Sequence, residues 1–177
     1  MRVVSGKYKS KFIQAPKNLP VRPTTDFAKE ALFNVLNNMY YFDEISVLDL
    51  FCGTGNISYE FGSRGCKDIT SVDQNVSCIR FVDHMSKEME LGIISFQAEV
   101  ESFLSKSKRK FDLIFMDPPY DYANYEQVVT LVFSNQLLTE RGILVLEHDS
   151  KSEFSQFKEL IKTRKYGKVQ FSFFEYI

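Results

Sequence analysis

The sequence predicts an α/β fold in which a mostly parallel sheet is covered by helices on both faces and is preceded by a short N-terminal hairpin. Short apolar stretches alternate with segments of helical periodicity along most of the chain. A glycine-containing turn follows the first apolar stretch, and a carboxylate stands at the end of each of the first four. Strands that alternate with helices are typical of βαβ units, whose right-handed crossovers place helices on both faces.

The N-terminal segment predicts a hairpin followed by a helix. Residues 2–14 place Gly6 between two short runs of partly alternating character, which is typical of a β-hairpin. In the segment 22–38, Thr24 or Thr25 can cap a helix, and Asp26 lies near its positive end. Apolar residues then recur at helical spacing: Phe27, Ala31, Leu32, Val35 and Leu36.

The rest of the chain predicts five strands, each followed by a helix. The apolar stretches that predict strands are residues 45–51, 68–73, 93–99, 111–117 and 142–149. The segments that predict helices are residues 56–65, 76–91, 100–108, 125–138 and 153–165. The chain ends in the apolar segment 168–176. In such sheets ligands bind beyond the carboxyl ends of the strands, so residues at those ends are functional candidates.

Length and composition are those of one globular domain. The 177 residues are 44% hydrophobic and 25% charged, which excludes disordered and collagen-like classes. No apolar run approaches the roughly 20 residues that cross a bilayer, and residues 1–11 lack the apolar centre of a secretory signal, so a cytoplasmic location is expected. The three cysteines have no metal-type spacing, and we expect reduced thiols and no metal site.

Basic residues are concentrated at the N-terminus. Six of the 22 basic residues precede Asp26, and none of the 23 acidic residues does. We therefore divide the chain into a basic arm or hairpin, residues 1–25, and a main domain, residues 26–177. This asymmetry fits an arm that faces nucleic acid, and it fits a solvated basic tail equally well.

The carboxylates at the first three strand ends predict a nucleoside site. Gly53 and Gly55 allow a tight turn after Asp49, but Ser58 replaces the third glycine of a dinucleotide fingerprint, which disfavours a pyrophosphate. Asp73 follows Gly53 by 20 residues and can accept both hydroxyls of a ribose. A ribose without a pyrophosphate suggests S-adenosylmethionine, whose cationic ammonium and sulfonium groups favour Asp49. Glu99 can accept from the adenine amine, or it is an exposed loop acid.

The fourth strand end, Asp117-Pro118-Pro119-Tyr120, predicts a site for an exocyclic amine. The two prolines restrict φ and remove backbone donors, so the loop presents acceptors. If Asp117 and the Pro118 carbonyl hold the two hydrogens of a nucleobase amine, its lone pair can point at a sulfonium methyl group. Tyr120 offers a ring on which an extruded base can stack. Tyr122 and Tyr125 either wall the same pocket or belong to the core or its rim.

Four segments together resemble the RsmD family of 16S rRNA guanine-N2 methyltransferases, within the class I S-adenosylmethionine-dependent methyltransferases. They are RVVSGKYKSKFI, RPTTDFAKEALFNVL, DLFCGTGNISYEFGSRG and FDLIFMDPPY. The resemblance implies a seven-stranded Rossmann-like sheet, the cofactor S-adenosylmethionine and methyl transfer to a guanine of 16S rRNA, naked or within the assembled or assembling small ribosomal subunit.

The resemblance also implies roles for particular residues. The catalytic residues are Asp117, Pro118, Pro119 and Tyr120. The cofactor-binding residues are Asp49, Phe51, Gly53, Thr54, Gly55, Asp73, Gln74 and Glu99. The nucleic-acid-binding residues are Arg2, Lys7, Lys9, Lys11 and Arg22, and Arg22 can alternatively serve the cofactor's carboxylate.

The chain departs from the family pattern at a few positions. Cys52 stands where the family usually has alanine, and Asn56 and Ser58 replace small or apolar residues at a helix start. Glu99 stands where many methyltransferases have aspartate. Two other functions stay open: methylation of adenine N6 in DNA or RNA, which uses the same acceptor loop, and a nucleic-acid-binding module that has lost turnover.

Overall fold

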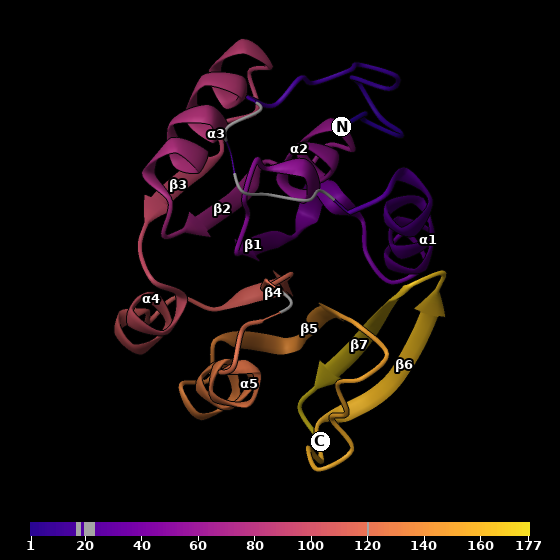
Figure 1. Cartoon of the computed structure of the whole chain (residues 1–177), viewed down its shortest axis with the longest axis vertical. Helices are drawn as coiled ribbons and strands as arrows, with labels where there is room; N and C mark the ends of the chain where they lie inside the picture. Colours follow the sequence, from indigo (N-terminus) through magenta and orange to yellow (C-terminus); the bar gives the residue numbers. More distant parts are fainter. Residues whose placement is uncertain (17–18, 20–23, 120) are drawn as a thin grey trace.

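Seven strands form one mixed sheet in the computed structural model, which describes residues 1–16, 19, 24–119 and 121–177 (Figure 1). The strand order is β3-β2-β1-β4-β5-β7-β6. Strands β1 to β5 pair in parallel, whereas β7 is antiparallel to both of its neighbours. The strands are β1 (Ser46–Leu50), β2 (Asp68–Asp73), β3 (Ile94–Gln97), β4 (Phe111–Met116), β5 (Leu138–His148), β6 (Leu160–Tyr166) and β7 (Val169–Glu175). The predicted α/β fold with a mostly parallel seven-stranded sheet is confirmed.

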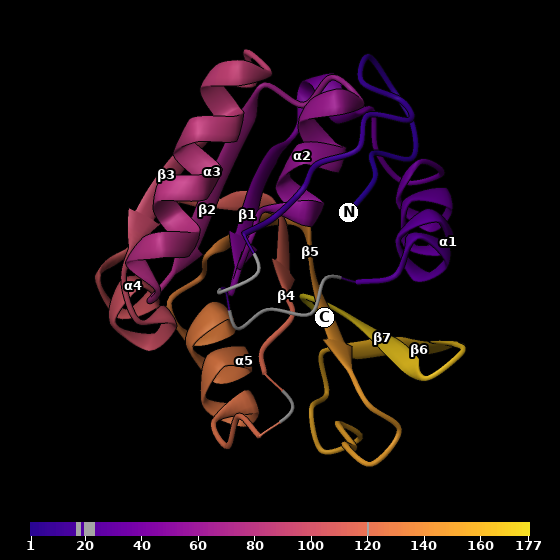
Figure 2. The ribbon, with the colours of Figure 1, turned by 45° about the horizontal axis from the view of Figure 1, so that its top comes forward.

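Helices cover both faces of the sheet, as the sequence predicts (Figures 1 and 2). The first face carries α1 (Asp26–Leu36), α2 (Asn56–Ser63) and α3 (Val76–Glu88). The second carries α4 (Val100–Lys106) and α5 (Tyr125–Ser134). A 3-10 turn, η1 (Phe42–Glu44), connects α1 to β1.

The central strands are apolar throughout because both of their faces are buried. Side chains alternate between the faces of a strand, so Leu113 and Phe115 of β4 belong to the core under α1, α2 and α3. Ile114 and Met116 belong to the core under α4 and α5. All four side chains are at most 1% exposed. Strand β1 is likewise buried on both faces, so its candidate functional residues lie at its carboxyl end and in the loop that follows.

Helix α1 begins where the sequence predicts. The Thr25 hydroxyl accepts from the backbone N–H of Ala28 at 3.2 Å, and Asp26 lies in the first turn. Thr25 rather than Thr24 is therefore the cap. The Thr24 side chain is free of this role and reaches the carboxyl edge of the sheet.

The helix predicted at residues 153–165 is wrong, because residues 160–166 form β6. Phe154 and Phe157 of this segment pack against the core. From Leu160 onward, however, the chain pairs with β7 in a hairpin that turns through Gly167 at φ +64°. Long-range pairing with an apolar strand thus outweighs local periodicity. The fifth strand also starts earlier than predicted, at Leu138, and the preceding helix ends at Ser134.

The N-terminal arm doubles back as predicted, but one antiparallel bridge, Arg2 to Phe12, replaces two strands. Its turn lies against the end of α2, where Lys7 N–H donates to the Ser63 carbonyl at 2.7 Å. A Cβ on Gly6 would lie 1.8 Å from that carbonyl oxygen, so only glycine fits here. Val3 and Ile13 are buried in the core shared with α1 and α2. The domain boundary at residue 25 stays a prediction.

Within the described residues, no helix combines the length and the apolar character that a membrane span requires.

Candidate active site

The candidate site lies at the carboxyl edge of the sheet, where the loops after β1 and β4 are neighbours. These strands pair directly, with Leu50 opposite Met116, so the loop that follows Leu50 lies beside Asp117. Gly53 and Gly55 have φ of +52° and +81°. A Cβ on Gly55 would lie 2.6 Å from the ring of Tyr59, so both backbone conformation and space require glycine there.

Asp73 holds the glycine loop against the end of β2. One carboxylate oxygen accepts from the backbone N–H of Gly53 at 2.9 Å, and the other accepts from Asn75 N–H at 2.8 Å. An ionised carboxylate can accept about four hydrogen bonds, so each oxygen keeps capacity for another donor. Asp73 therefore fits a ligand with neighbouring hydroxyl groups, such as a ribose.

Asp49 lies beneath the loop and is only 1% exposed. Its carboxylate accepts from the backbone N–H of Ser58 at 3.1 Å and from the Ser58 hydroxyl at 2.5 Å. Burial raises the pKa of Asp49 to about 7; the Ser58 hydrogen bonds oppose this rise and the Asp73 charge adds to it. The Ser58 hydroxyl also lies 2.7 Å from that of Ser71, so this departure from the family pattern joins α2 to β1 and β2. The predicted contact of Asp49 with the cofactor ammonium stays a prediction.

The other predicted cofactor residues surround the same loop. Phe51 is half-buried and has φ of +57°, a conformation that few non-glycine residues adopt. Thr54 is buried, whereas Gln74 is exposed. Glu99 is the residue before α4, and its exposed side chain makes no capping hydrogen bond. Acceptors at the ends of β2 and β3, together with the glycine turn, fit the ribose and adenine of S-adenosylmethionine.

The acceptor loop after β4 has one proline carbonyl to which no described residue donates. Pro118 is buried, and nothing among the described residues donates to its carbonyl. The Pro119 carbonyl accepts from Tyr122 N–H at 2.9 Å and from the Tyr125 hydroxyl at 3.3 Å. Among the described residues, the Pro118 carbonyl is therefore the proline carbonyl open to a ligand, and it belongs to the residue directly after Asp117. Tyr120 and Arg22 lie outside the described residues.

Asp117 shares the hydroxyl of Thr24 with a second carboxylate, Glu147. The Thr24 hydroxyl lies 2.8 Å from Glu147 Oε2 and 3.5 Å from Asp117 Oδ2. Burial raises the pKa of Glu147 to about 7. Burial also raises the pKa of Asp117 well above its usual range, and the charges of Glu147 and Asp49 add to that rise. The pair of carboxylates is therefore stabilised either by a proton that the two groups share or by a hydrogen-bond donor placed beside them.

Sequence analysis missed Glu147 and the role of Thr24. Glu147 is 5% exposed and follows four buried apolar residues of β5, 143–146, directly before the last residue of the strand. A charged residue in that position, at the same edge as Asp117, is a signal that could have identified it. The adjacent residue His148 bonds to Ser172 and to the Asp149 carbonyl, a structural role. Thr24 gave no signal beyond helix capping, because its contacts are 93 and 123 residues away in the chain.

Aromatic rings form one side of the site. Phe51 of the glycine loop meets Tyr122 at 4.9 Å between ring centroids, and Tyr122 meets Tyr125 at 5.6 Å. Tyr122 is held by its hydroxyl, which donates to Glu101 at 2.5 Å. These rings link the loop after β1 to the loop after β4. They make an apolar wall between these two loops.

The basic residues in the turn of the arm lie away from this edge, whereas Arg2 lies near it, beside the first residue of α1. Helix α2 returns from the carboxyl edge, so the arm turn that contacts its last residue lies at the opposite edge (Figure 2). Lys7 and Lys11 form ion pairs with Glu90 and Glu88 at the end of α3, at 3.8 and 2.8 Å. Arg2 pairs with Asp26 at 3.0 Å. Lys9 is exposed, and among the described residues it has no ion-pair partner.

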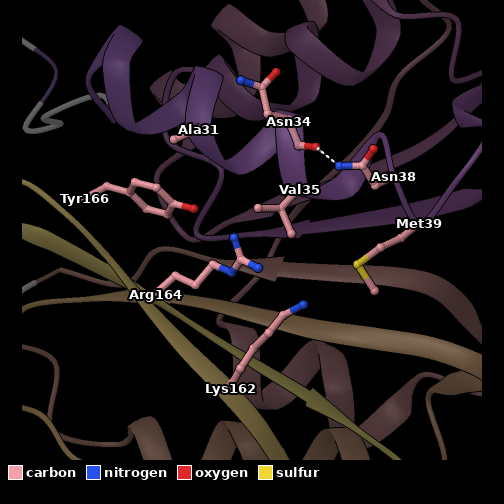
Figure 3. A pocket seen from close by; sticks show the side chains of 8 residues that line it. All are labelled: Ala31, Asn34, Val35, Asn38, Met39, Lys162, Arg164 and Tyr166. Carbon is pink, nitrogen blue, oxygen red and sulfur yellow. Dashed lines mark hydrogen bonds between the residues drawn. The ribbon is translucent and has the colours of Figure 1, made fainter.

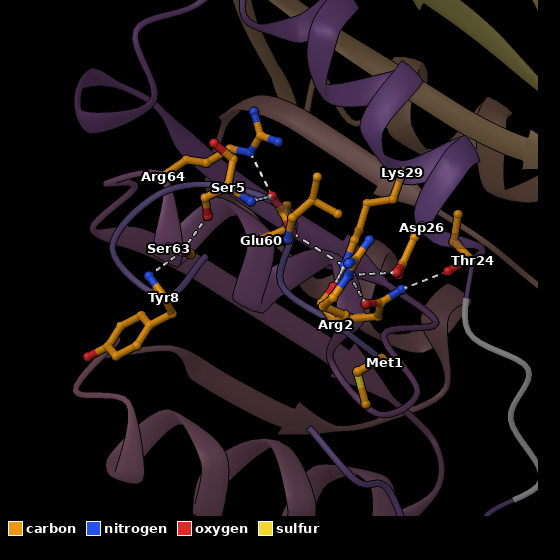
Figure 4. A network of polar contacts seen from close by, with 12 residues as sticks. Met1, Arg2, Ser5, Tyr8, Thr24, Asp26, Lys29, Glu60, Ser63 and Arg64 are labelled. Carbon is orange, nitrogen blue, oxygen red and sulfur yellow. Dashed lines mark hydrogen bonds and ion pairs between the residues drawn. The ribbon is translucent and has the colours of Figure 1, made fainter. Parts of the chain in front are cut away.

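A buried ion pair joins the arm to the cofactor loop (Figure 4). Lys29 of α1 is 1% exposed, and its ammonium donates to the Arg2 carbonyl at 2.6 Å and to Asn56 at 2.8 Å. It also lies 3.3 Å from Glu60, whose carboxylate accepts from the backbone of Val4 and Ser5. Burial lowers the pKa of Lys29, and the charge of Glu60 opposes that effect. Asn56, the first residue of α2, is thereby fixed.

Together, the strand order, the glycine loop and the carboxylates at the strand ends define a class I methyltransferase fold of the Rossmann-like type. The model of the family described as "Conserved hypothetical protein 95" matches residues 1–175. The chain belongs to this family.

Curated relatives cover nearly the whole chain. The "Putative rRNA methyltransferase YlbH" of Bacillus subtilis is 36% identical over 93% of this chain and 92% of its own length. The "Ribosomal RNA small subunit methyltransferase D" of Haemophilus influenzae is 30% identical over 83% of this chain and 78% of its own length. The family assignment therefore rests on the arm and the sheet together.

Solved structures show the same fold. The hypothetical protein TTHA0928 of Thermus thermophilus superposes with a TM-score of 0.87 at 24% identity, covering 99% of both chains. Coclaurine N-methyltransferase, solved with N-methylheliamine and SAH, superposes with a TM-score of 0.57 at 24% identity, over 71% of this chain and 37% of that one.

Proposed function

We propose that this protein transfers a methyl group from S-adenosylmethionine to the exocyclic N2 amine of a guanine in 16S rRNA. The observation that carries the proposal is the position of two neighbouring acceptors at the carboxyl edge, beside the glycine loop: the Asp117 carboxylate and the Pro118 carbonyl, to which no described residue donates. The printed names of the relatives, YlbH and small subunit methyltransferase D, support rRNA as the substrate class.

The loop residues would hold the cofactor. Asp73 would accept from the ribose hydroxyls with the lone pairs that Gly53 and Asn75 leave free. Glu99 would accept from the adenine amine, and the glycine turn with Phe51, Thr54 and Gln74 would border the ligand. When bound, the sulfonium group supplies an electrophilic methyl carbon.

Asp117 and Pro118 would position the amine of the substrate. The Asp117 carboxylate and the Pro118 carbonyl each accept one amine hydrogen, which turns the nitrogen lone pair away from the base ring. Two acceptors fixed in place also stabilise the positive charge that the nitrogen gains during transfer. Asp117 is then the nearest group to accept the proton that the amine loses. Its raised pKa, caused first by burial and then by Glu147, suits this role.

The aromatic wall would receive the base. An extruded guanine needs a flat apolar surface, and Phe51 and Tyr122 present rings beside the acceptors. Tyr120 remains the proposed stacking residue. We also propose that basic residues of the arm contact RNA phosphates: Arg2, Lys7, Lys9, Lys11 and Arg22. For Arg2, Lys7 and Lys11, an RNA phosphate would replace the carboxylate with which each forms an ion pair.

The test is methyl transfer to small ribosomal subunits from cells that lack the gene. Subunits and naked 16S rRNA are incubated with labelled S-adenosylmethionine, and the RNA is digested to nucleosides for mass analysis. We expect N2-methylguanosine with wild-type protein and far less with Asp117→Ala, which removes the side-chain acceptor. N6-methyladenosine would instead establish the adenine alternative, and cofactor binding without any product would favour a binding module.

A further inference from the structure

A groove separates helix α1 from the edge strand β6 (Figure 3). The groove has a volume of about 400 Å³ and lies outside the candidate active site. Its floor is formed by Lys162, Arg164 and Tyr166, and Asn34 and Val35 of α1 form its wall. Figure 3 shows the cationic ends of Lys162 and Arg164 turned toward α1.

The floor residues lie on one face of β6 because side chains alternate along a strand. Their partners in β7 are Phe173 for Lys162 and Phe171 for Arg164, and both phenylalanines belong to the core on the α1 face. Lys165 has the opposite orientation. The ammonium of Lys162 lies 4.8 Å from the ring centroid of Phe173, a contact that holds it over the groove.

The charge of the groove is unbalanced. None of the residues that line it is acidic, and within the described part of the chain neither Lys162 nor Arg164 forms an ion pair. The Asn34 side-chain amide is exposed, and its backbone carbonyl accepts from Asn38 at 2.9 Å. Two cations, an amide and a tyrosine ring thus face one concave surface. This combination suits phosphate oxygens and sugar or base faces of a nucleic acid.

The groove begins at the same sheet edge as the candidate active site. Arg164 is paired with Phe171, and Phe171 with Glu147, so Arg164 is two strands away from Glu147 at the same level. Two strand spacings place their backbones about 10 Å apart. Thr24, immediately before α1, contacts Glu147, and α1 then forms the wall of the groove. A chain leaving the active site can therefore follow α1 into the groove.

We infer that this groove binds the phosphate backbone of the RNA whose base enters the active site. The inference rests on the proposed function, since it takes RNA as the substrate. Lysines on an edge strand also discourage strand pairing, but that purpose does not require a concave surface or a shared orientation toward α1. The arm's paired lysines, Lys7 and Lys11, lie at the opposite edge, so the groove places two further cations at the site's own edge.

The test compares neighbouring charges on one strand. Arg164→Glu and Lys162→Glu reverse the charges in the groove, and Lys165→Glu makes the same change on the other face of β6. Binding of an unmodified 16S rRNA transcript is measured between 50 and 300 mM salt, with Arg164→Gln and Lys162→Gln as milder variants. Thermal unfolding and cofactor binding confirm that each variant is folded.

We expect each groove variant to weaken binding about five- to eightfold near 0.1 M salt and to make the salt dependence shallower by about 0.7 to 0.9 per lost contact. Lys165→Glu should have less effect. Equal losses for all three variants, or none, would overturn the inference. Weaker binding to intact subunits with unchanged binding to the naked transcript would also overturn it and indicate a ribosomal protein partner. If wild-type protein binds RNA in this way but methylates none, the groove stands and the proposed function fails.

Discussion

Two regions at the carboxyl side of the sheet treat charge in opposite ways. Around the glycine loop and the end of β5, the carboxylates of Asp49 and Glu147 are buried, and each is bonded to a hydroxyl. In the groove beside β6, the side chains of Lys162 and Arg164 face a cavity and have no ion-pair partner in the described chain. Buried charge requires partners, whereas exposed charge is free to meet a ligand. The first region is built to fix geometry and the second to attract a polyanion.

The largest effect on stability should come from the buried ion pair that fixes the arm and α2. Glu60→Ala leaves the Lys29 ammonium without its counter-ion and the backbone N–H groups of Val4 and Ser5 without an acceptor. We expect the free energy of unfolding to fall by about 3 to 5 kcal/mol. Urea unfolding followed by circular dichroism measures it.

The matched control is the exposed pair of the same arm, Lys11 and Glu88. Glu88→Ala should cost less than about 1 kcal/mol, because water solvates both groups once they separate. Similar losses for Glu60→Ala and Glu88→Ala would contradict the distinction between buried and exposed charge.

The next largest effect concerns catalysis. Asp117→Ala removes one of the two acceptors for the amine, so we expect turnover to fall by about 10²- to 10³-fold. Cofactor binding, measured by calorimetry, should be largely kept because Asp117 is not part of the glycine loop. Asp121→Ala, a change to an exposed carboxylate four residues later, is the control. Equal turnover in the two variants would remove Asp117 from the mechanism.

The pH dependence tests the pair formed by Asp117 and Glu147. A protonated Asp117 cannot accept an amine hydrogen, so activity should fall as the pH decreases through the raised pKa of the pair, with Glu147 at about 7. Glu147→Gln removes a like charge and should move this acidic limb toward lower pH. The rate of methyl transfer, measured from pH 5 to 9 for the wild type and for Glu147→Gln, gives the position of this acidic limb.

The same variant should change stability with a defined sign. Both carboxyl groups have pKa values above their usual range in the folded protein, so their contribution favours folding in acid and is lost as the pH rises through these raised pKa values, about 7 for Glu147. Glu147→Gln should therefore flatten the fall in unfolding free energy between pH 4 and 8. Glu175→Gln, at the exposed end of β7, should leave both profiles as in the wild type.

The smallest effect should come from Ser58. Ser58→Ala removes a hydroxyl that donates to the buried Asp49 and lies beside Ser71, while the backbone N–H of residue 58 still donates to Asp49. We expect a loss of about 1 kcal/mol in unfolding free energy and a higher pKa for Asp49. Chemical denaturation measures the first, and carboxyl chemical shifts measure the second. A stability gain would show that the hydroxyl is not needed in this position.

Much of the fold could be predicted because its signals are local. The apolar stretches of β1, β2 and β4 are buried on both faces, and the helix beginning at Thr25 has its cap and acidic first turn in the sequence. The failure at residues 153–165 has a non-local cause. Phe154 and Phe157 pack against the core, but Lys162 and Arg164 are fixed by pairing with Phe173 and Phe171 across a turn.

The candidate site shows the same division. Asp73 and Asp117 could be found because they stand at the ends of strands that the sequence identifies. Gly53 and Gly55, in the loop after the first of these strands, are recognisable as a tight turn. Glu147 and Thr24 were missed because their proximity joins positions 123 residues apart. No local pattern carries that information.

The sequence by itself determined the alternation of strands and helices, the glycine turn and the acceptor loop, since each depends on neighbouring residues and on conformational limits of glycine and proline. Only the tertiary structure decided that Glu147 shares the Thr24 hydroxyl with Asp117, that the arm turn lies at the far edge, and that β6 and α1 form a basic groove. These features depend on strand order and on the return direction of each helix, so they arise only when distant segments pack together.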